Sequence, residues 1–241
     1  ECRRVLFRSH SCSKILTIIP ARAGSKRIPG KNSKHLSGIP LIAWSIKSAL
    51  DSLLEYVVVS TDNQKIADIS LKYGAKVPFI RSYEFATDEA SVIDVVLEVI
   101  ELYRQSEQAF DAVLLLQPTS PFRTIETIRS AINQFDGKES IISVSPARSH
   151  PYWCKRIENG ELFSFNNMQD LSLKRSQDLP NAYELNGSIY LSSIDNIIKN
   201  KSFYSDNTRA LIISSEEEAL DIDTPFDWFI AEAIANNRVK V

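Results

Sequence analysis

The chain has 241 residues, of which 44% are hydrophobic and 24% charged, and these values are typical of one globular α/β domain. Its formal net charge of −2 excludes a general attraction to nucleic acid or to anionic lipid. No apolar run approaches the ~20 residues that a membrane-spanning helix needs, so we expect neither nucleic acid nor a membrane as a partner.

Residues 1–13 do not fit the pattern that follows them. The only methionine is Met168, and these first residues lack the apolar core of a signal peptide. We expect residues 1–13 to be a non-native or disordered segment and a single domain to occupy residues 14–241. The three cysteines (Cys2, Cys12 and Cys154) show neither metal-ligand spacing nor a disulfide framework, which favours a reducing compartment, the cytoplasm.

Apolar segments of strand-like pattern then alternate with segments of helical period, which predicts βαβ units around a mostly parallel sheet. The predicted strands are residues 15–20, 56–60, 75–80, 111–117, 140–145, 185–191 and 210–214. The predicted helices are residues 40–50, 62–74, 88 or 91 to about 103, 120–135, a short helix after residue 191, and a last helix from Thr224-Pro225. We expect an α/β fold with a Rossmann-like nucleotide-binding domain.

Three local features extend this prediction. Asp62 is expected to cap its helix, and Ser120-Pro121 to start another. Residues 146–183 lose the regular period and carry Asn-Gly at 159–160, so we expect a small inserted arm there, more suited to a partner subunit or substrate than to the main core. On the last helix, the residues expected to face inward are Phe226, Phe229, Ile230 and Ala233.

The most informative segment is the loop that follows the predicted strand 15–20. No Asp or Glu occurs from Cys2 to Leu50, and this loop carries four cations, Arg22, Lys26, Arg27 and Lys31. Gly24 and Gly30 let backbone amides approach an anion closely, and the cations can neutralise a polyphosphate. A solvated basic turn is the alternative. The loop matches neither a P-loop nor a dinucleotide fingerprint, so we predict a different kind of triphosphate-binding loop.

Two further motifs are expected at the same edge of the sheet, where the carboxyl ends of parallel strands form ligand sites. One is Gln117–Arg123, between a strand and a helix; a cation in the first turn of a helix opposes the macrodipole, so Arg123 favours an anion partner over plain solvation. The other is Asp221-Ile-Asp223, whose two carboxylates share one face of an extended segment. Asp227 is expected to be structural, because Thr224-x-x-Asp227 approximates a capping box.

The two carboxylates of Asp221 and Asp223 are hard oxygen ligands opposite a basic loop. Such ligands suit Mg²⁺ held between protein and phosphates, so we predict Mg²⁺ as the cofactor.

Two segments closely resemble signatures of the acylneuraminate cytidylyltransferases, the CMP-sialic acid synthetases and their CMP-legionaminic acid relatives. They are Pro-Ala-Arg-Ala-Gly-Ser-Lys-Arg-Ile-Pro-Gly-Lys-Asn (20–32) and Leu-Leu-Gln-Pro-Thr-Ser-Pro-Phe-Arg (115–123). The resemblance covers about residues 14–235, with its motifs in family order, and it also includes Asp221-Ile-Asp223 and Asn186-Gly-Ser-Ile-Tyr190. It implies CTP and a keto sugar acid as substrates, and a homodimer in which the arm completes the neighbour's sugar pocket.

The resemblance also implies roles for single residues. Arg22, Lys26, Asp221 and Asp223 are expected to be catalytic, with Lys31 helping to hold the β- and γ-phosphates. The residues expected to contact the nucleotide are Ala21, Arg22, Gly24, Lys26, Lys31, Asn32, Ser91, Gln117, Thr119 and Ser120. The residues expected to contact the sugar are Gln117, Arg123, Lys155, Arg175, Glu184, Asn186 and Tyr190. For Ser120, helix capping is an alternative role, and for Lys155 and Arg175 a solvated surface.

Two positions depart from the family pattern. Glu184 stands where sialic-acid-activating relatives often carry Arg, and a carboxylate there repels the sugar's own carboxylate unless it meets a hydroxyl or amino group. Val92 stands where a serine is often found near the cytosine, and Ser91 is the neighbour that can substitute. The first departure bears on which sugar is used more than on the reaction.

The predicted reaction is transfer of CMP from CTP to the anomeric hydroxyl of a nine-carbon α-keto sugar acid, sialic acid or a legionaminic- or pseudaminic-type acid, with release of pyrophosphate. The alternatives are a cytidylyltransferase for an eight-carbon, KDO-type keto sugar acid and a non-catalytic CTP-binding regulatory protein on the same fold.

Overall fold

A computed structural model describes residues 13–81, 91–165 and 175–238. Its main sheet has the strand order β10-β6-β9-β5-β1-β4. The bounds are β1 (Ile15–Pro20), β4 (Val57–Ser60), β5 (Ala112–Leu115), β6 (Ile141–Pro146), β9 (Tyr183–Ser193) and β10 (Arg209–Ile212). β1 pairs in parallel with β4 and β5, and β6 with β10, whereas β9 runs antiparallel between β5 and β6. The predicted α/β fold with a mostly parallel sheet is confirmed, with β9 as the exception.

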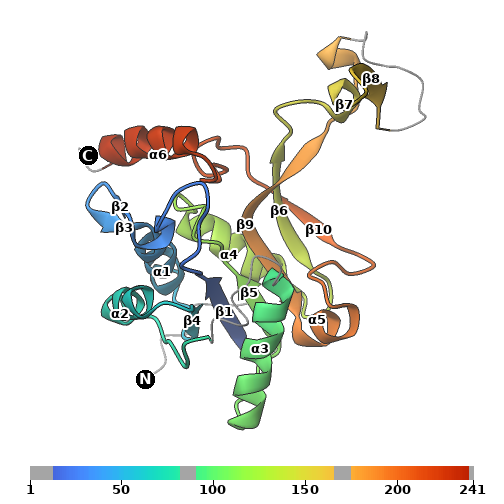
Figure 1. The fold of residues 1–241 in the computed structure, drawn as a ribbon. Coiled ribbons are helices and arrows are strands. Elements are labelled where there is room, and N and C mark those ends of the chain that lie inside the picture. Colours follow the sequence, from blue (N-terminus) through green and yellow to red (C-terminus); the bar gives the residue numbers. More distant parts are fainter. Residues whose placement is uncertain (1–12, 82–90, 166–174, 239–241) are drawn as a thin grey trace.

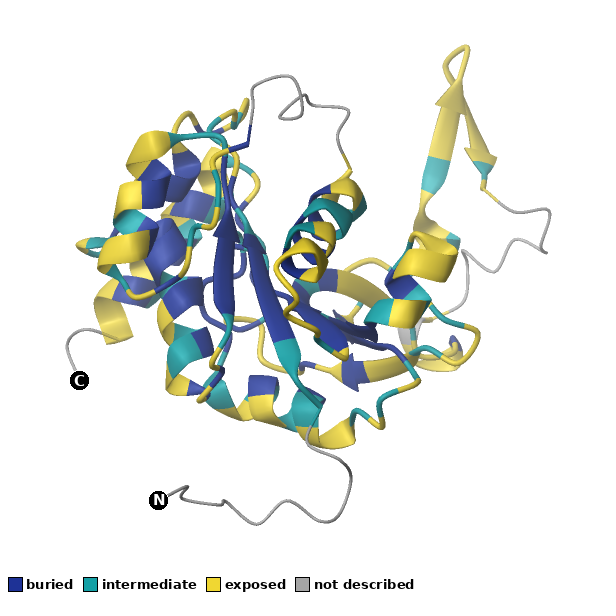
Figure 2. Ribbon diagram, turned by 90° about the horizontal axis from the view of Figure 1, so that it is seen from below, coloured by how far each residue is buried: buried dark blue, intermediate teal, exposed yellow. Residues whose placement is uncertain are grey.

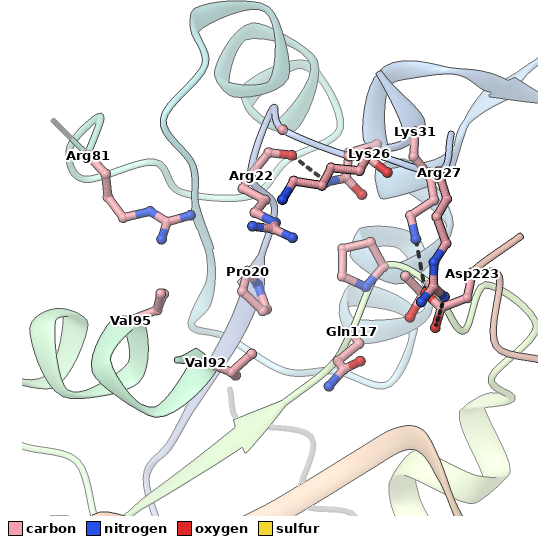
Figure 3. Close-up of a pocket in the computed structure, with 15 residues that line it drawn as sticks. Pro20, Arg22, Lys26, Arg27, Lys31, Arg81, Val92, Val95, Gln117 and Asp223 are labelled. Carbon is pink, nitrogen blue, oxygen red and sulfur yellow. Dashed lines mark hydrogen bonds and ion pairs between the residues drawn. The ribbon is translucent and has the colours of Figure 1, made fainter. Parts of the chain in front are cut away.

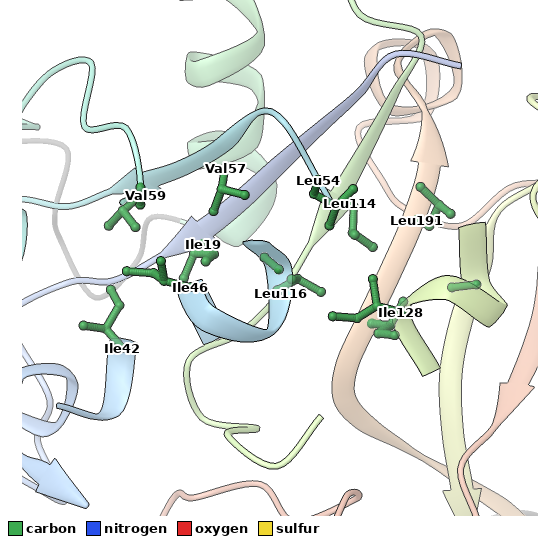
Figure 4. Packing of buried hydrophobic residues seen from close by; sticks show 14 of the residues in the cluster. Ile19, Ile42, Ile46, Leu54, Val57, Val59, Leu114, Leu116, Ile128 and Leu191 are labelled. Carbon is green, nitrogen blue, oxygen red and sulfur yellow. The ribbon is translucent and has the colours of Figure 1, made fainter. Parts of the chain in front are cut away.

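Helices cover both faces of this sheet (Figure 1). Their bounds are α1 (Leu41–Asp51), α2 (Gln64–Lys72), α3 (Val92–Gln105), α4 (Ile125–Gln134), α5 (Ile194–Asn200) and α6 (Pro225–Arg238). Successive side chains of a strand point to opposite faces. Ile19 therefore packs in one core with Ile46 of α1, as Figure 4 shows, whereas Ile18 packs in a second core with Val99 of α3. Burial on both faces explains the continuous apolar runs of these strands.

A third apolar cluster lies under α6, and here the predicted inward face is wrong for Phe226, Phe229 and Ala233 and confirmed only for Ile230. Trp228, Ala231 and Ala235 are the buried residues of this helix, with Ile230 partly buried against them. Phe226 and Phe229 are 68% and 67% exposed, and Ala233 is exposed as well. The Trp228 indole is larger than either phenyl ring and packs in this cluster, while its Nε1 donates to Glu232 Oε1 of the same helix at 2.9 Å, so its polar group is satisfied at the buried face.

Three predicted element boundaries also differ. Asn63, not Asp62, caps α2, since its side chain accepts the Ile66 amide at 3.1 Å. Helix α4 starts at Ile125 and is capped by Thr124, so Ser120-Pro121 precede it in a turn. Residues 75–80 form only the isolated bridges Val58–Lys76 and Thr61–Ile80, not a strand. At α3, Ser91 provides the cap in a capping box with Asp94, whereas Asp88 lies outside the described residues.

Within residues 146–183 the structure contains a hairpin of β7 (Lys155–Glu158) and β8 (Glu161–Ser164). Its turn places Asn159 and Gly160 at φ of 51° and 85°, as a two-residue hairpin loop with two left-handed positions requires. The hairpin stands away from the sheet in Figure 1 and is mostly exposed in Figure 2. Two short strands, β2 (His35–Leu36) and β3 (Ile39–Pro40), form a separate small pair.

Among the described residues, no helix combines the length and apolar character required to cross a lipid bilayer. Of the predicted segment 1–13, only Ser13 belongs to the described residues.

Candidate active site

A cavity of about 550 Å³ opens at the carboxyl ends of β1 and β5, and all three predicted motifs reach it (Figure 3). The predicted site residues that line it are Arg22, Gly24, Lys26, Lys31, Asn32, Gln117, Thr119 and Asp223. Since these residues come from three distant parts of the chain, the predicted convergence on one sheet edge is confirmed.

The basic loop leaves β1 at Pro20 and is held by backbone bonds at its start. The Ala21 amide donates to the Ser60 carbonyl at 2.9 Å, and Asn32 Nδ2 donates to the Arg22 carbonyl at 2.9 Å. Ala21 is buried and does not line the cavity, so this predicted nucleotide contact is, in the structure, an anchor of the loop. Gly30 supplies the left-handed φ of 65° that turns the chain back toward Lys31.

The acidic segment meets the basic loop directly. The Asp223 carboxylate lies 3.5 Å from Lys31 Nζ and 3.6 Å from an Arg27 guanidinium nitrogen. Lys31 Nζ also donates to the Ile222 carbonyl at 2.7 Å, and the Ile222 amide donates to the Thr119 carbonyl at 2.8 Å. The backbone of Ile222, between the two aspartates, is therefore hydrogen-bonded both to the basic loop and to the segment 117–123.

Asp221, unlike Asp223, is not one of the residues that line the cavity. Its Oδ1 is buried and has no hydrogen-bond partner among the described residues. Burial raises the pKa of the Asp221 carboxyl, and the nearby carboxylates of Asp223 and Asp227 act in the same direction. The Thr119 side chain and the Lys31 ammonium act in the opposite direction. A buried carboxylate oxygen of this kind is suited to pair with a cation.

Asp227 takes the predicted structural role. Its Oδ2 accepts the Thr224 amide at 2.7 Å and the Asp223 amide at 3.1 Å, while its own amide donates to Thr224 Oγ1 at 3.2 Å. The capping box at the start of α6 is confirmed and fixes the chain directly after Asp223.

At the opposite end of the cavity the sequence reasoning missed two residues, Arg81 and Val95, whereas Val92 occupies a position that the family resemblance placed near the cytosine. Arg81, Val92 and Val95 line this end, and Figure 3 shows the Arg81 guanidinium on this side, directed toward Arg22. Arg81 is 5% exposed, its Nη2 donates to the Ser60 carbonyl at 3.4 Å, and its Nε has no partner among the described residues. Burial lowers the pKa of Arg81, whereas the Asp62 and Glu98 carboxylates raise it. The sequence offered one indication that Arg81 belongs to the site, because Arg81 directly follows the apolar segment 75–80 that was predicted to be a strand.

Arg123 is placed differently from the prediction, because it precedes α4 instead of lying in its first turn. It is 3% exposed, and its guanidinium donates to the Ser188 carbonyl at 2.7 Å, the Gln117 carbonyl at 3.0 Å and Ser45 Oγ at 3.3 Å. Burial lowers the pKa of Arg123 to about 9, against the opposing effect of Glu218, so it stays charged at neutral pH. Its described partners are protein atoms, and a sugar contact stays a prediction.

Ser120 and Asn186 form a buried support behind Gln117. Ser120 Oγ donates to the Asn186 carbonyl at 3.4 Å, and Asn186 Oδ1 accepts Ser143 Oγ at 2.6 Å. Between them Gly187 has a φ of 72°, and a Cβ there would lie 3.3 Å from Gln117 Oε1. This glycine therefore lets β9 approach the second motif closely.

The other predicted sugar contacts do not line the cavity. Lys155 lies in the hairpin, where its Nζ donates to Ser164 Oγ at 2.9 Å, and Arg175 and Glu184 are exposed. The Tyr190 ring packs on Phe203 with centroids 5.8 Å apart, and burial raises its pKa. Ser91, predicted near the nucleotide, caps α3 next to the lining residue Val92.

Comparison with known proteins assigns this architecture to a family. Residues 16–212 match the family model described as "Cytidylyltransferase". The chain is 49% identical, over 225 residues, to the "CMP-N,N'-diacetyllegionaminic acid synthase" of Legionella pneumophila, covering 92% of this chain and 96% of that protein. It is 34% identical to the "Pseudaminic acid cytidylyltransferase" of Campylobacter jejuni, again with 92% and 96% covered.

A likeness in fold extends further. The structure of a "CMP:2-keto-3-deoxy-manno-octonic acid synthetase" solved with CTP superposes with a TM-score of 0.69, over 94% of this chain and 100% of the other, at 18% identity. An identity this low shows the shared fold alone.

Proposed function

Since the chain belongs to the cytidylyltransferase family, we propose that it transfers CMP from CTP to the anomeric hydroxyl of a nine-carbon α-keto sugar acid and releases pyrophosphate. The observation that carries this proposal is one cavity in which a loop of four cations faces the Asp223 carboxylate. Such a cavity can hold a triphosphate and neutralise the charge that develops on a leaving pyrophosphate.

The lining of the cavity supports one orientation of the nucleotide. Arg22, Lys26 and Lys31 form the cationic part and suit the β- and γ-phosphates. Val92 and Val95 form an apolar wall beside the Arg81 guanidinium, and this combination suits a flat base that carries acceptor atoms. Gln117 lies between the two parts, where the α-phosphate and the attacking hydroxyl meet in this orientation (Figure 3).

The residues present fit Mg²⁺. Asp221 has a buried, unpartnered oxygen, and Asp223 lies at the cavity wall beside the phosphate-binding cations. The described residues include no group of three or more His, Cys, Asp or Glu arranged to hold a metal, so phosphate oxygens of CTP complete the coordination in our proposal. When bound, the ion neutralises phosphate charge and orients the leaving group.

The transfer forms a bond between the anomeric oxygen and the α-phosphorus of CTP. The bond from that phosphorus to the bridging oxygen breaks, its electron pair leaves with pyrophosphate, and the proton of the attacking hydroxyl passes to water. Among the described residues, no His or Cys lines the cavity, which suits direct displacement without a covalent enzyme intermediate. The role of the loop cations is to hold the leaving group and stabilise its charge.

For the sugar, the 49% identity to the diacetyllegionaminic acid synthase supports a legionaminic-type acid over sialic acid. We further propose a cytoplasmic homodimer. The hairpin supports the dimer, because Ile157 and Leu162 face each other across it and are 72% and 70% exposed, which is expected of apolar residues that a second subunit covers.

Pyrophosphate release tests the proposal. Purified protein is incubated with CTP, Mg²⁺ and one of four acids: diacetyllegionaminic, pseudaminic, N-acetylneuraminic or the eight-carbon KDO. Release with the first acid alone is the expected result. Release with KDO alone replaces the nine-carbon proposal with the eight-carbon alternative. CTP binding without release on any acid indicates the non-catalytic alternative, and no CTP binding overturns the assignment of the loop.

A further inference from the structure

Asp62 connects the basic loop to the neighbouring strand. Its Oδ1 accepts the Ala23 amide at 2.7 Å, across 39 residues of sequence. Two further bonds, from the Ala21 amide to Ser60 and from Asn32 to the Arg22 carbonyl, fix the adjacent residues. Three consecutive residues of the loop thus have hydrogen-bonded backbone groups, and for Ala23 the acceptor is the charged side chain of Asp62.

The local structure makes Asp62 available for this contact. Asn63 caps α2, so the helix does not require the Asp62 carboxylate. Thr61 is fully buried, and its Oγ1 accepts the Asn63 amide at 3.2 Å, which fixes the turn out of β4. The carboxylate is therefore presented toward the loop by a well-anchored turn.

The same turn also positions Arg81. The Arg81 amide donates to the Thr61 carbonyl at 2.9 Å, and the Ser60 carbonyl accepts both Arg81 Nη2 and the Ala21 amide. Asp62 is one of the two carboxylates whose charge acts on the Arg81 guanidinium. Residues 60–62 thus hold both the phosphate end and the apolar end of the cavity.

We propose that Asp62 is a positioning residue of the nucleotide site: by holding the Ala23 amide it sets the path of the basic loop around the triphosphate. This inference rests on the proposed function, because it takes CTP as the ligand. Removing the acceptor releases the loop where it begins to curve around the cavity, so the phosphates lose more than the base does.

The experiment measures dissociation constants of CTP and CMP by calorimetry in the presence of Mg²⁺, together with kcat and KM, for Asp62→Ala, Asp62→Asn and the wild type. Asp68→Ala is the matched control, an exposed aspartate of α2 that bonds only Gln64 among the described residues. We expect Asp62→Ala to weaken CTP binding about 10-fold or more, the factor of a lost charge-assisted hydrogen bond, and CMP binding much less. Asp62→Asn keeps an acceptor oxygen and restores most of the affinity, and Asp68→Ala behaves as the wild type.

Several outcomes overturn the inference. Wild-type CTP affinity in Asp62→Ala does so, and so does an equal loss for CTP and CMP, which indicates general disruption of the site. If Asp62→Ala does not fold, Asp62→Ser, which lacks the Oδ1 acceptor but keeps a polar side chain, takes its place: lost CTP selectivity over CMP supports the inference, and unchanged selectivity together with unchanged stability overturns it. A wild type that binds CMP and CTP equally weakly overturns the proposed function itself.

Discussion

The cavity at the edge of the sheet and the hairpin at residues 155–164 differ in whether their side chains have partners within the chain. At the cavity, Lys31 has its charge paired with Asp223 and its ammonium bonded to a carbonyl, and the loop backbone is tied on both sides. In the hairpin, Ile157 and Leu162 are exposed apolar residues on a two-stranded element that stands away from the core (Figure 1).

This difference separates two requirements for activity. The groups that handle a triphosphate are already assembled within one chain, so nucleotide binding should be a property of the single subunit. An isolated two-stranded hairpin is marginally stable in water, and its apolar residues need a cover. Use of the sugar should therefore depend on association of two subunits, because Lys155 and Arg175 lie away from the cavity of their own chain.

The largest effect is expected at Lys26. Lys26→Ala removes a cation from the cavity wall and should lower kcat about 10²- to 10³-fold, the range measured when one group that stabilises transition-state charge is removed. The measurement is pyrophosphate release at saturating CTP and sugar acid. Lys72→Ala, at the exposed end of α2, is the control of equal charge. Near-normal turnover of Lys26→Ala contradicts its role and weakens the view that the cavity alone handles the phosphates.

The next effect concerns the support of the cavity. Arg123→Lys keeps a charge but cannot reproduce three hydrogen bonds to Ser188, Gln117 and Ser45, so it should lower the free energy of unfolding by about 2–3 kcal/mol. Denaturant unfolding measures this loss. Arg129→Lys on the exposed part of α4 should change it little. Unchanged stability of Arg123→Lys together with a raised KM for the sugar would instead favour the predicted sugar contact.

At the hairpin, the double variant Ile157→Asp, Leu162→Asp tests whether its exposed apolar residues form the dimer interface. Charges at two facing apolar positions should weaken dimerisation about 30-fold or more, the factor of a 2 kcal/mol interface residue. Sedimentation velocity measures the shift to monomer, and calorimetry should show CTP affinity within a factor of about two of the wild type. A dimer that persists places the interface elsewhere, and a parallel loss of CTP binding contradicts the separation of the two regions.

The sequence predicted most of the sheet and helices because buried strands and amphipathic helices have different apolar periods. It did not predict the direction of β9, since an antiparallel strand buried on both faces carries the same apolar run as a parallel one. It missed the rotation of α6, because Phe226 and Phe229 fit a helical stripe as well as the buried Trp228 does.

The residues of the candidate site were likewise predicted only in part. The cations of the loop and the carboxylates of Asp221 and Asp223 are clustered in sequence, so their chemistry was visible without coordinates. Arg81 is a single cation after an apolar stretch, and only the bridge between Ile80 and Thr61 brings it to the cavity. Asp62 was wrongly predicted to cap α2, because Asp and Asn are both favoured at this position and the sequence does not show which of the two neighbours, Asp62 or Asn63, caps the helix.

The smallest change in CTP affinity is expected at Asp223 without a metal, and it tests whether this carboxylate competes with CTP for the loop cations. The Asp223 carboxylate is 55% exposed and pairs with Arg27 and Lys31, so free CTP must displace it to reach the two cations. Asp223→Asn should therefore tighten CTP binding in EDTA by about 2- to 5-fold, as expected for exposed ion pairs of up to ~1 kcal/mol. Calorimetry measures the affinity, and Asp195→Asn, at an exposed position of α5, controls for net charge.

With Mg²⁺ the Asp223→Asn variant should lose turnover, because a neutral amide is a poorer ligand for a hard cation than a carboxylate. Weaker binding in EDTA would contradict this competition, because it would mean that Asp223 helps to hold the nucleotide without a metal.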